Sequence, residues 1–78
     1  MPKLNLTNDI RNETMRLLLK DQQDEINAHH IYSLAAGFTK DEHNAEIIKK
    51  ISRDELKHYH RLKSITGHEI KPQKRKIK

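Results

Sequence analysis

The sequence predicts an all-α protein, an antiparallel two-helix hairpin that dimerises into a four-helix bundle. Apolar residues recur three or four residues apart over two long segments, which is helical spacing. Only a short link separates these segments, so the two helices are expected to run antiparallel. With 78 residues, of which 33% are hydrophobic and 35% charged, a lone hairpin has no interior of its own. A second copy is therefore expected to cover its apolar face, in a two-fold dimer.

The first helix is expected over about residues 9–38. Asn8 or Asp9 suits its N-cap, because a short side-chain oxygen can accept a hydrogen bond from a backbone amide of the first turn. Gly37 suits its end, where a left-handed residue is favoured. Residues 1–8 are polar with isolated leucines, and we expect them to form a flexible lead-in.

The second helix is expected over about residues 40–66. Thr39 and Glu42 form a capping-box pattern at its start, and Gly67 suits a C-cap at its end. The hairpin as a whole then covers residues 9–70. The apolar residues of the second helix share one stripe, which we expect to pack against the first helix: Ile47, Ile48, Ile51, Leu62 and Ile65.

A Glu-x-x-His motif lies in the middle of this stripe, at Glu55 and His58. Burial of an unpaired charge costs several kcal/mol, so such groups are normally paired or bound to metal. The i, i+3 spacing lets both side chains point to one centre. Glu25 lies in the first helix at the same distance from the turn, about 15 residues, so the two carboxylates are expected at one height. We expect the motif and Glu25 to face each other across the hairpin.

One hairpin thus supplies two carboxylates and one imidazole, and a dimer doubles this set. Four carboxylates and two imidazoles on four helices form the ligand set of dinuclear iron or manganese sites in helical bundles. Carboxylates neutralise and bridge cations, and imidazole suits iron. His29 shares the face of Glu25 and is an alternative or extra ligand, although a hydrogen-bonding role is favoured. Tyr32, two turns beyond Glu25, either packs or places its hydroxyl beside the ligands.

The same residues resemble the first half of a ferritin-like domain of the rubrerythrin kind. The resemblance covers about residues 15–72 and is carried by Asp24-Glu25-Ile26, His30-Ile31-Tyr32 and Asp54-Glu55-Leu56-Lys57-His58-Tyr59. The segment from Ile65 to Pro72 is similar to rubrerythrin-like domains, some of which are fused to membrane domains of the vacuolar iron transporter type. The short two-helix form also resembles encapsulated ferritins, which build their iron site across a subunit interface.

The resemblance implies a ferritin-like four-helix bundle with two iron ions per dimer, or manganese, held by Glu25, Glu55 and His58. It implies oxidation of Fe(II) by dioxygen or peroxide, in iron storage and detoxification or in peroxide removal. Typical members carry a second helix pair in one chain, so the expected partner is a second copy, a higher homo-oligomer, a missing second half-domain or an encapsulating shell. Rubrerythrins often add a thiolate-ligated iron centre, which a chain without cysteine cannot hold.

The basic tail, residues 71–78, carries five positive charges, which equals the net charge of the chain, +5. The alternative interpretation is a metal-free helical dimerisation module whose tail contacts nucleic acid or another anionic partner. No recognition-helix signature or aromatic stacking platform supports specific nucleic-acid binding. Such a module would also bury four carboxylates that persist only when protonated, at raised pKa values.

Composition excludes several classes of protein. Without cysteine, the chain has neither a disulfide framework nor a thiolate metal site. No apolar run approaches the roughly 18 residues of a membrane-spanning helix, and the N-terminus is too polar for a signal peptide. We therefore expect a cytoplasmic protein without a membrane span.

Overall fold

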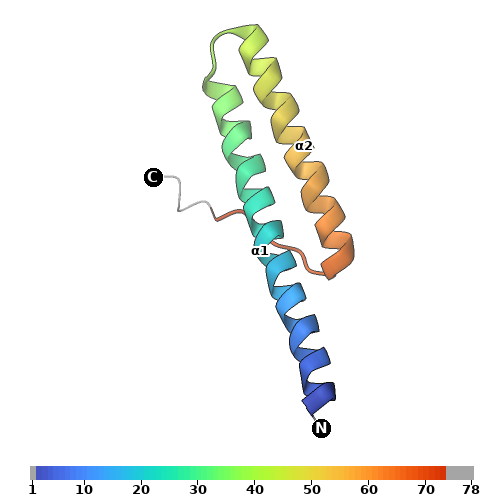
Figure 1. Ribbon diagram of the computed structural model, residues 1–78. Coiled ribbons are helices and arrows are strands. Elements are labelled where there is room, and N and C mark those ends of the chain that lie inside the picture. The colour runs from blue at the N-terminus through green and yellow to red at the C-terminus, as the bar shows by residue number, and fades with distance from the viewer. Residues whose placement is uncertain (1, 74–78) are drawn as a thin grey trace.

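The protein folds as an all-helical hairpin. A computed structural model describes residues 2–73, and these contain two helices and no strand. Helix α1 spans Pro2–Phe38 and helix α2 spans Glu42–Thr66, and the two run antiparallel, side by side (Figure 1). The helical hairpin predicted from the sequence is confirmed. Over the same residues, neither helix combines the length and the apolar character needed to cross a membrane.

The first helix is longer than predicted at its N-terminal end. It begins at Pro2, so residues 2–8 continue the helix instead of forming a flexible lead-in, and neither Asn8 nor Asp9 is an N-cap. The fixed φ of proline suits the first position of a helix. No glycine or further proline interrupts residues 3–36, and each residue added to an existing helix forms one more backbone hydrogen bond. The helix therefore extends beyond the expected start.

The link between the helices differs from the prediction in its capping residues. Gly37 lies inside α1 and has no positive φ. The Thr39 hydroxyl donates to the Ala35 carbonyl at 2.7 Å, so it closes α1 and does not cap α2. The N-cap of α2 is Asp41, whose carboxylate accepts a hydrogen bond from the amide of Asn44 at 2.9 Å. The predicted capping box at Thr39 is therefore wrong.

At the other end of α2, the chain turns back and crosses α1 (Figure 1). Gly67 is the C-cap, as predicted, with a left-handed φ of 72° that glycine adopts without strain. We call residues 67–73 the strap. The Tyr59 hydroxyl donates to the Ile70 carbonyl and accepts from the Ile70 amide, each at 2.9 Å, so the strap is held to α2.

The strap contains the start of the predicted basic tail. The side-chain amide of Gln23 donates to the Lys71 carbonyl at 2.9 Å. The backbone amide of Gln73 donates to the side-chain oxygen of Asn27 at 2.8 Å. These bonds place the start of the tail against α1, and the other predicted tail positions, 74–78, lie outside the described residues.

The contact between α1 and α2, which we call the inner interface, is built mostly from small and polar side chains. Every seventh residue along α2 is buried there: Ala45, Ser52, Tyr59 and Thr66. The buried residues of α1 are Gln22, Ile26 and Ala36. A seven-residue period keeps one line of side chains turned toward a neighbouring helix. The inner interface is therefore regular but contains little large apolar surface.

Three of the five residues in the predicted apolar stripe of α2 lie outside the inner interface. Ile47, Ile51 and Ile65 are 47%, 38% and 58% exposed. The prediction that the stripe packs against α1 is therefore wrong for these three isoleucines, whereas Ile48 and Leu62 are half-buried. Neighbouring residues are about 100° apart around a helix, so Ile51 and the buried Ser52 face different directions. The three exposed isoleucines, together with Tyr32 of α1, form what we call the open face.

Candidate metal centre

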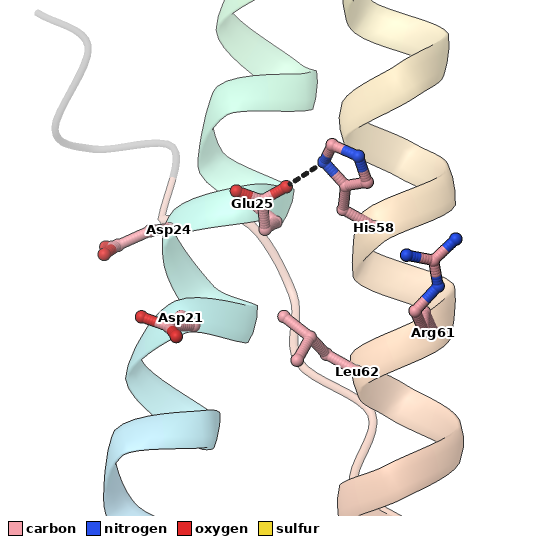
Figure 2. A pocket seen from close by; sticks show the side chains of 6 residues that line it. All are labelled: Asp21, Asp24, Glu25, His58, Arg61 and Leu62. Atoms are coloured by element: carbon pink, nitrogen blue, oxygen red, sulfur yellow. Dashed lines mark hydrogen bonds and ion pairs between the residues drawn. The ribbon is translucent and has the colours of Figure 1, made fainter.

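Three side chains that can bind a metal meet on the open face. Glu25 comes from the middle of α1, and Glu55 and His58 come from α2, where their spacing places both on one side. One donor atom from each lies within 4.8 Å of the others. The Nδ1 atom of His58 is 2.9 Å from Oε2 of Glu25 and 3.3 Å from Oε1 of Glu55. Figure 2 shows Glu25 and His58 pointing toward each other. The structure thus brings the three predicted ligands together.

The cluster lies at the edge of the inner interface, where one side is open. The side chains of Glu25, Glu55 and His58 are 25%, 22% and 53% exposed. Ile51 precedes Glu55 by about one turn of α2. Tyr32 follows Glu25 by about two turns of α1. The motif faces Glu25 of α1 across the hairpin, as predicted, and the side of the cluster that α1 does not cover lies beside the exposed Ile51 and Tyr32.

A pocket of about 330 Å³ adjoins the cluster (Figure 2). It is lined by Asp21, Asp24, Glu25, His58, Arg61 and Leu62. Asp21 and Arg61 were not predicted as site residues, although spacing could have found both. Asp21 lies one helical turn before Glu25, and Arg61 lies one turn after His58, so each shares the face of a ligand. The pocket therefore carries both acidic and basic groups beside the cluster.

The two carboxylates of the cluster share one hydrogen-bond donor. Burial raises the pKa of Glu25 above its ordinary value, because a carboxylate that leaves water loses hydration. The hydrogen bond from His58 opposes this shift, and the nearby Glu55 carboxylate adds to it. When both carboxylates are ionised, they only accept hydrogen bonds, and Nδ1 of His58 is then their donor. A cation bound in place of the Nδ1 proton would contact the same two carboxylates.

The spacing of the donor atoms fits a bound cation. Bonds from nitrogen or oxygen ligands to such metals are about 2.0–2.2 Å, so two donors at right angles on one ion are about 3 Å apart. The separations of 2.9 and 3.3 Å around His58 Nδ1 have this size. To bind metal, Nδ1 must lose its proton. Two carboxylates and one imidazole would leave coordination positions free on an octahedral ion.

The other two predicted residues lie outside the cluster. His29 is not among the side chains whose donor atoms meet within 4.8 Å. Its Nδ1 lies 2.8 Å from the Ser52 carbonyl oxygen, so the structure gives it the hydrogen-bonding role that we favoured. Tyr32 is 37% exposed on the open face. Its place beside the metal ligands stays a prediction.

Comparison with known proteins identifies no relative: no family model, no curated protein and no solved structure matches the chain. The candidate site therefore rests on its own geometry. Its basis is the convergence of three donor groups from two helices, with the spacing that a cation requires and with one side left open.

Proposed function

We propose that two hairpins associate through their open faces and assemble a dinuclear, ferritin-like metal centre from Glu25, Glu55 and His58 of each chain. The substrate is Fe(II), which the protein oxidises with dioxygen or peroxide as electron acceptor, in iron storage and detoxification or in peroxide removal. One observation carries the proposal. The three donor groups converge within 4.8 Å on the side of the hairpin that its own chain leaves uncovered.

The open face supports association with a second copy. Ile51 and Ile65 remain exposed on either side of the Glu55–His58 motif along α2, so large apolar side chains flank the cluster along this helix. Removing apolar surface from water contributes about 25 cal/mol per Å². A two-fold axis through this face would bring the same residues of both chains into contact. It would also double the ligand set to four carboxylates and two imidazoles.

Within residues 2–73, the N-terminal part of α1 also lacks a partner helix. The end of α2 lies beside Gln22, whose side chain accepts a hydrogen bond from Thr66 at 2.6 Å. The preceding part of α1 extends beyond α2 (Figure 1). Ile10, Met15 and Leu17 lie in this part and are exposed. Most of the stability of a helix in a protein comes from packing against a neighbour, so this extension favours a second chain alongside it.

The chain's own residues explain how such a site would bind its ions. Four carboxylates carry the negative charge that balances two divalent cations, and the imidazoles bind as neutral ligands. Bound iron supplies reversible one-electron chemistry. The apolar side chains of the open face exclude bulk water from the site once two chains meet, and this strengthens the attraction between carboxylates and cations. His58 gives its proton to solvent or to a nearby carboxylate when it binds metal.

The resemblance to the first half of a rubrerythrin-type domain supports the same assignment. The chain has one helix with a single glutamate and one helix with Glu-x-x-His. A complete site in a bundle needs two helices of each kind. A homodimer therefore supplies the number of helices that the site requires.

Metal content and molecular mass of tag-free protein, loaded with Fe(II) without oxygen, test the proposal. We expect about one iron per chain in a particle of two chains or a multiple of two, and a ferric absorption band when air is admitted. Glu55→Ala should bind no iron. Glu46→Ala is the matched control, because Glu46 is an exposed acid on the same helix that pairs only with Lys49, at 3.2 Å.

Two outcomes would contradict the proposal in different ways. A dimer that takes up no Fe(II) would remove the metal centre and leave the metal-free dimerisation module. A monomer that binds iron as tightly as any larger particle would remove the intersubunit site. In either case the wild type alone decides, before any variant is made.

A further inference from the structure

We infer that two polar contacts across the inner interface position the metal-binding side chains of α1 at the height of those of α2. The turn-side contact joins His29 to Ser52, and the strap-side contact joins Gln22 to Thr66. His29 and Gln22 lie about one turn to either side of the α1 ligand, so the contacts bracket the cluster. The inference rests on the proposed function, because it concerns the geometry of the same site.

The turn-side contact is a network of directed hydrogen bonds. Nδ1 of His29 lies 2.8 Å from the Ser52 carbonyl oxygen and 2.9 Å from the Ser52 hydroxyl. A carbonyl only accepts, so Nδ1 carries the proton. The Ser52 hydroxyl donates to the His29 carbonyl at 3.1 Å. The Ser33 hydroxyl oxygen lies 2.7 Å from the Ser52 hydroxyl oxygen. Ser52, which is 4% exposed, precedes Glu55 by one turn, so the contact joins the segments that carry the ligands.

The strap-side contact buries an amide completely. Gln22 is 0% exposed, and its Oε1 accepts a hydrogen bond from the Thr66 hydroxyl at 2.6 Å. Its Nε2 donates to the His68 carbonyl at 2.6 Å. The His68 amide donates to the Thr66 hydroxyl oxygen at 3.2 Å, which completes the group. A buried amide left without hydrogen-bond partners is strongly destabilising, so Gln22 favours the alignment in which both bonds form.

These contacts matter because the turn end of the inner interface resists sliding only weakly. It contains the small residues Ala36 and Ala45, which do not interlock as large side chains do. A shift of one residue along a helix moves a side chain by about 1.5 Å. The donor atoms of the cluster are separated by only 2.9 and 3.3 Å, so such a shift would break the site. The polar contacts oppose that shift at both ends of the cluster.

The test follows Co(II) binding to the full-length protein, because the visible spectrum of Co(II) reports the geometry of its ligands. His29→Leu removes the donor, and His29→Asn offers an amide N–H close to the position of Nδ1. His43→Leu is the control, since His43 is an exposed histidine of α2. We expect His29→Leu to weaken Co(II) binding roughly ten- to a hundredfold and to alter the spectrum, as loss of a residue that orients a ligand typically does. His29→Asn should restore most of both.

Ser52→Ala separates positioning from direct ligation by His29. This variant keeps the imidazole and its bond to the backbone carbonyl of residue 52 but loses the hydroxyl bonds to the His29 carbonyl and to Ser33. Positioning therefore predicts weaker Co(II) binding than in the wild type, by less than in His29→Leu, whereas direct ligation predicts no change. Thermal unfolding of each metal-free variant establishes that it is folded at the temperature of the binding measurement. A spectrum that changes while the protein stays folded cannot come from lost stability alone.

Gln22→Met tests the strap-side contact, because methionine fills a similar volume without the polar bonds. We expect it to weaken Co(II) binding and alter the spectrum as His29→Leu does. Gln23→Met is its matched control, since Gln23 bonds to the strap at Lys71 and not to α2. Gln23→Met should leave the affinity for Co(II) unchanged.

The outcomes for the inference and for the proposed function are distinct. A wild-type affinity and spectrum in both His29→Leu and Gln22→Met would overturn the inference while the metal centre stands. Loss of binding in His29→Leu that His29→Asn does not restore, with Ser52→Ala unchanged, would overturn it in favour of ligation by His29. Wild-type protein that binds no Co(II) would overturn the proposed function, and the inference with it.

Discussion

The two sides of α2 differ in the size and burial of their side chains. On the inner side, every seventh residue is buried, and Ala45, Ser52 and Thr66 among them are small. On the open side, Ile47 and Ile51 are large and apolar, yet they remain 47% and 38% exposed. A helix that packed only within its own chain would place isoleucine inside and serine outside. This pattern is the one expected of a helix with two neighbours, and it supports the proposed contact of α2 with a second chain on the side that residues 2–73 leave open.

The two sides of α2 differ in the kind of interaction they offer: hydrogen bonds, which align helices, on the inner side, and apolar surface, which favours association, on the open side. A hydrogen bond contributes a net of about 0.5–1.5 kcal/mol and has a required direction. Full burial of an isoleucine side chain contributes about 1.5–3 kcal/mol and has no direction. The inner side therefore fixes how the helices line up, and the open side holds most of the free energy that a partner would release. The candidate metal-binding cluster lies on the border between the two sides, at the edge of the inner interface.

Metal binding is expected to produce the largest effect on the open side. A ligand bound only by the native state adds RT ln(1 + [L]/Kd) to the free energy of unfolding, about 4 kcal/mol at a thousandfold excess over Kd. Denaturant unfolding with metal and with chelator measures this increment. Glu55→Ala should lose all of it. Without metal, Glu55→Ala should be at least as stable as the wild type, because one of two neighbouring carboxylates is gone. A less stable metal-free variant would contradict a site on a face that the dimer buries.

Ile47→Ser is expected to weaken the dimer by about 2 kcal/mol for each chain, because a buried isoleucine would lose its contact with the partner. The dissociation constant, measured by sedimentation equilibrium over a dilution series, reports the change. Ile31→Ser is a matched control, since Ile31 is 48% exposed on α1, close to the 47% of Ile47. Ile31 lies about 120° around α1 from Glu25, at 100° per residue. Equal weakening by both variants would show that the open face is not the dimer interface.

The hairpin and the three ligands could be predicted from the sequence for a simple reason. Helical spacing and distance from the turn depend only on residue numbers, so Glu25, Glu55 and His58 could be placed at one height without knowledge of packing. The inner side of α2 could not be predicted in the same way. The choice between Ile51 and Ser52 depends on hydrogen bonds from the other helix, which apolar periodicity does not contain.

The residues at which the helices begin and end could also not be predicted from the sequence. Thr39 and Asp41 are both residue types that cap helices, and they lie two residues apart. The backbone path through the turn decides between them, because the Thr39 hydroxyl is used by the Ala35 carbonyl. The early start of α1 at Pro2 depends on helix elongation, which residue-by-residue cap signals do not measure.

The pH dependence of stability should differ in sign between metal-free and metal-bound protein. The pKa of Glu25 is raised in the folded chain, so the folded state keeps this proton to a higher pH than the unfolded state. Its contribution to metal-free stability is therefore fully present below the ordinary value of 4.5 and is lost as the pH rises through the raised value. Glu25→Gln should remove that decline, and Glu46→Gln should not.

With metal bound, the dependence reverses, because protons compete with the cation for the same carboxylates and imidazole. Denaturant unfolding over roughly pH 4 to 7, with metal and with chelator, measures both slopes. Metal-free stability that rises with pH in the wild type and in Glu25→Gln alike would show that Glu25 does not control the dependence.

The smallest effect is expected at the start of α2, away from both faces. Asp41→Ala removes the side-chain oxygen that accepts from Asn44 and should lower the free energy of unfolding by about 1 kcal/mol. Thr39→Ala is the matched control, and it should cost less because the Thr39 hydroxyl donates to a carbonyl of α1 and caps no amide of α2. Thermal unfolding of the two variants ranks them. Asp41→Ala should leave the affinity for Co(II) unchanged, because the cap neither aligns the ligands nor covers them. If affinity fell in proportion to stability, metal binding would follow the stability of the whole hairpin, and the two sides of α2 would not have separate roles.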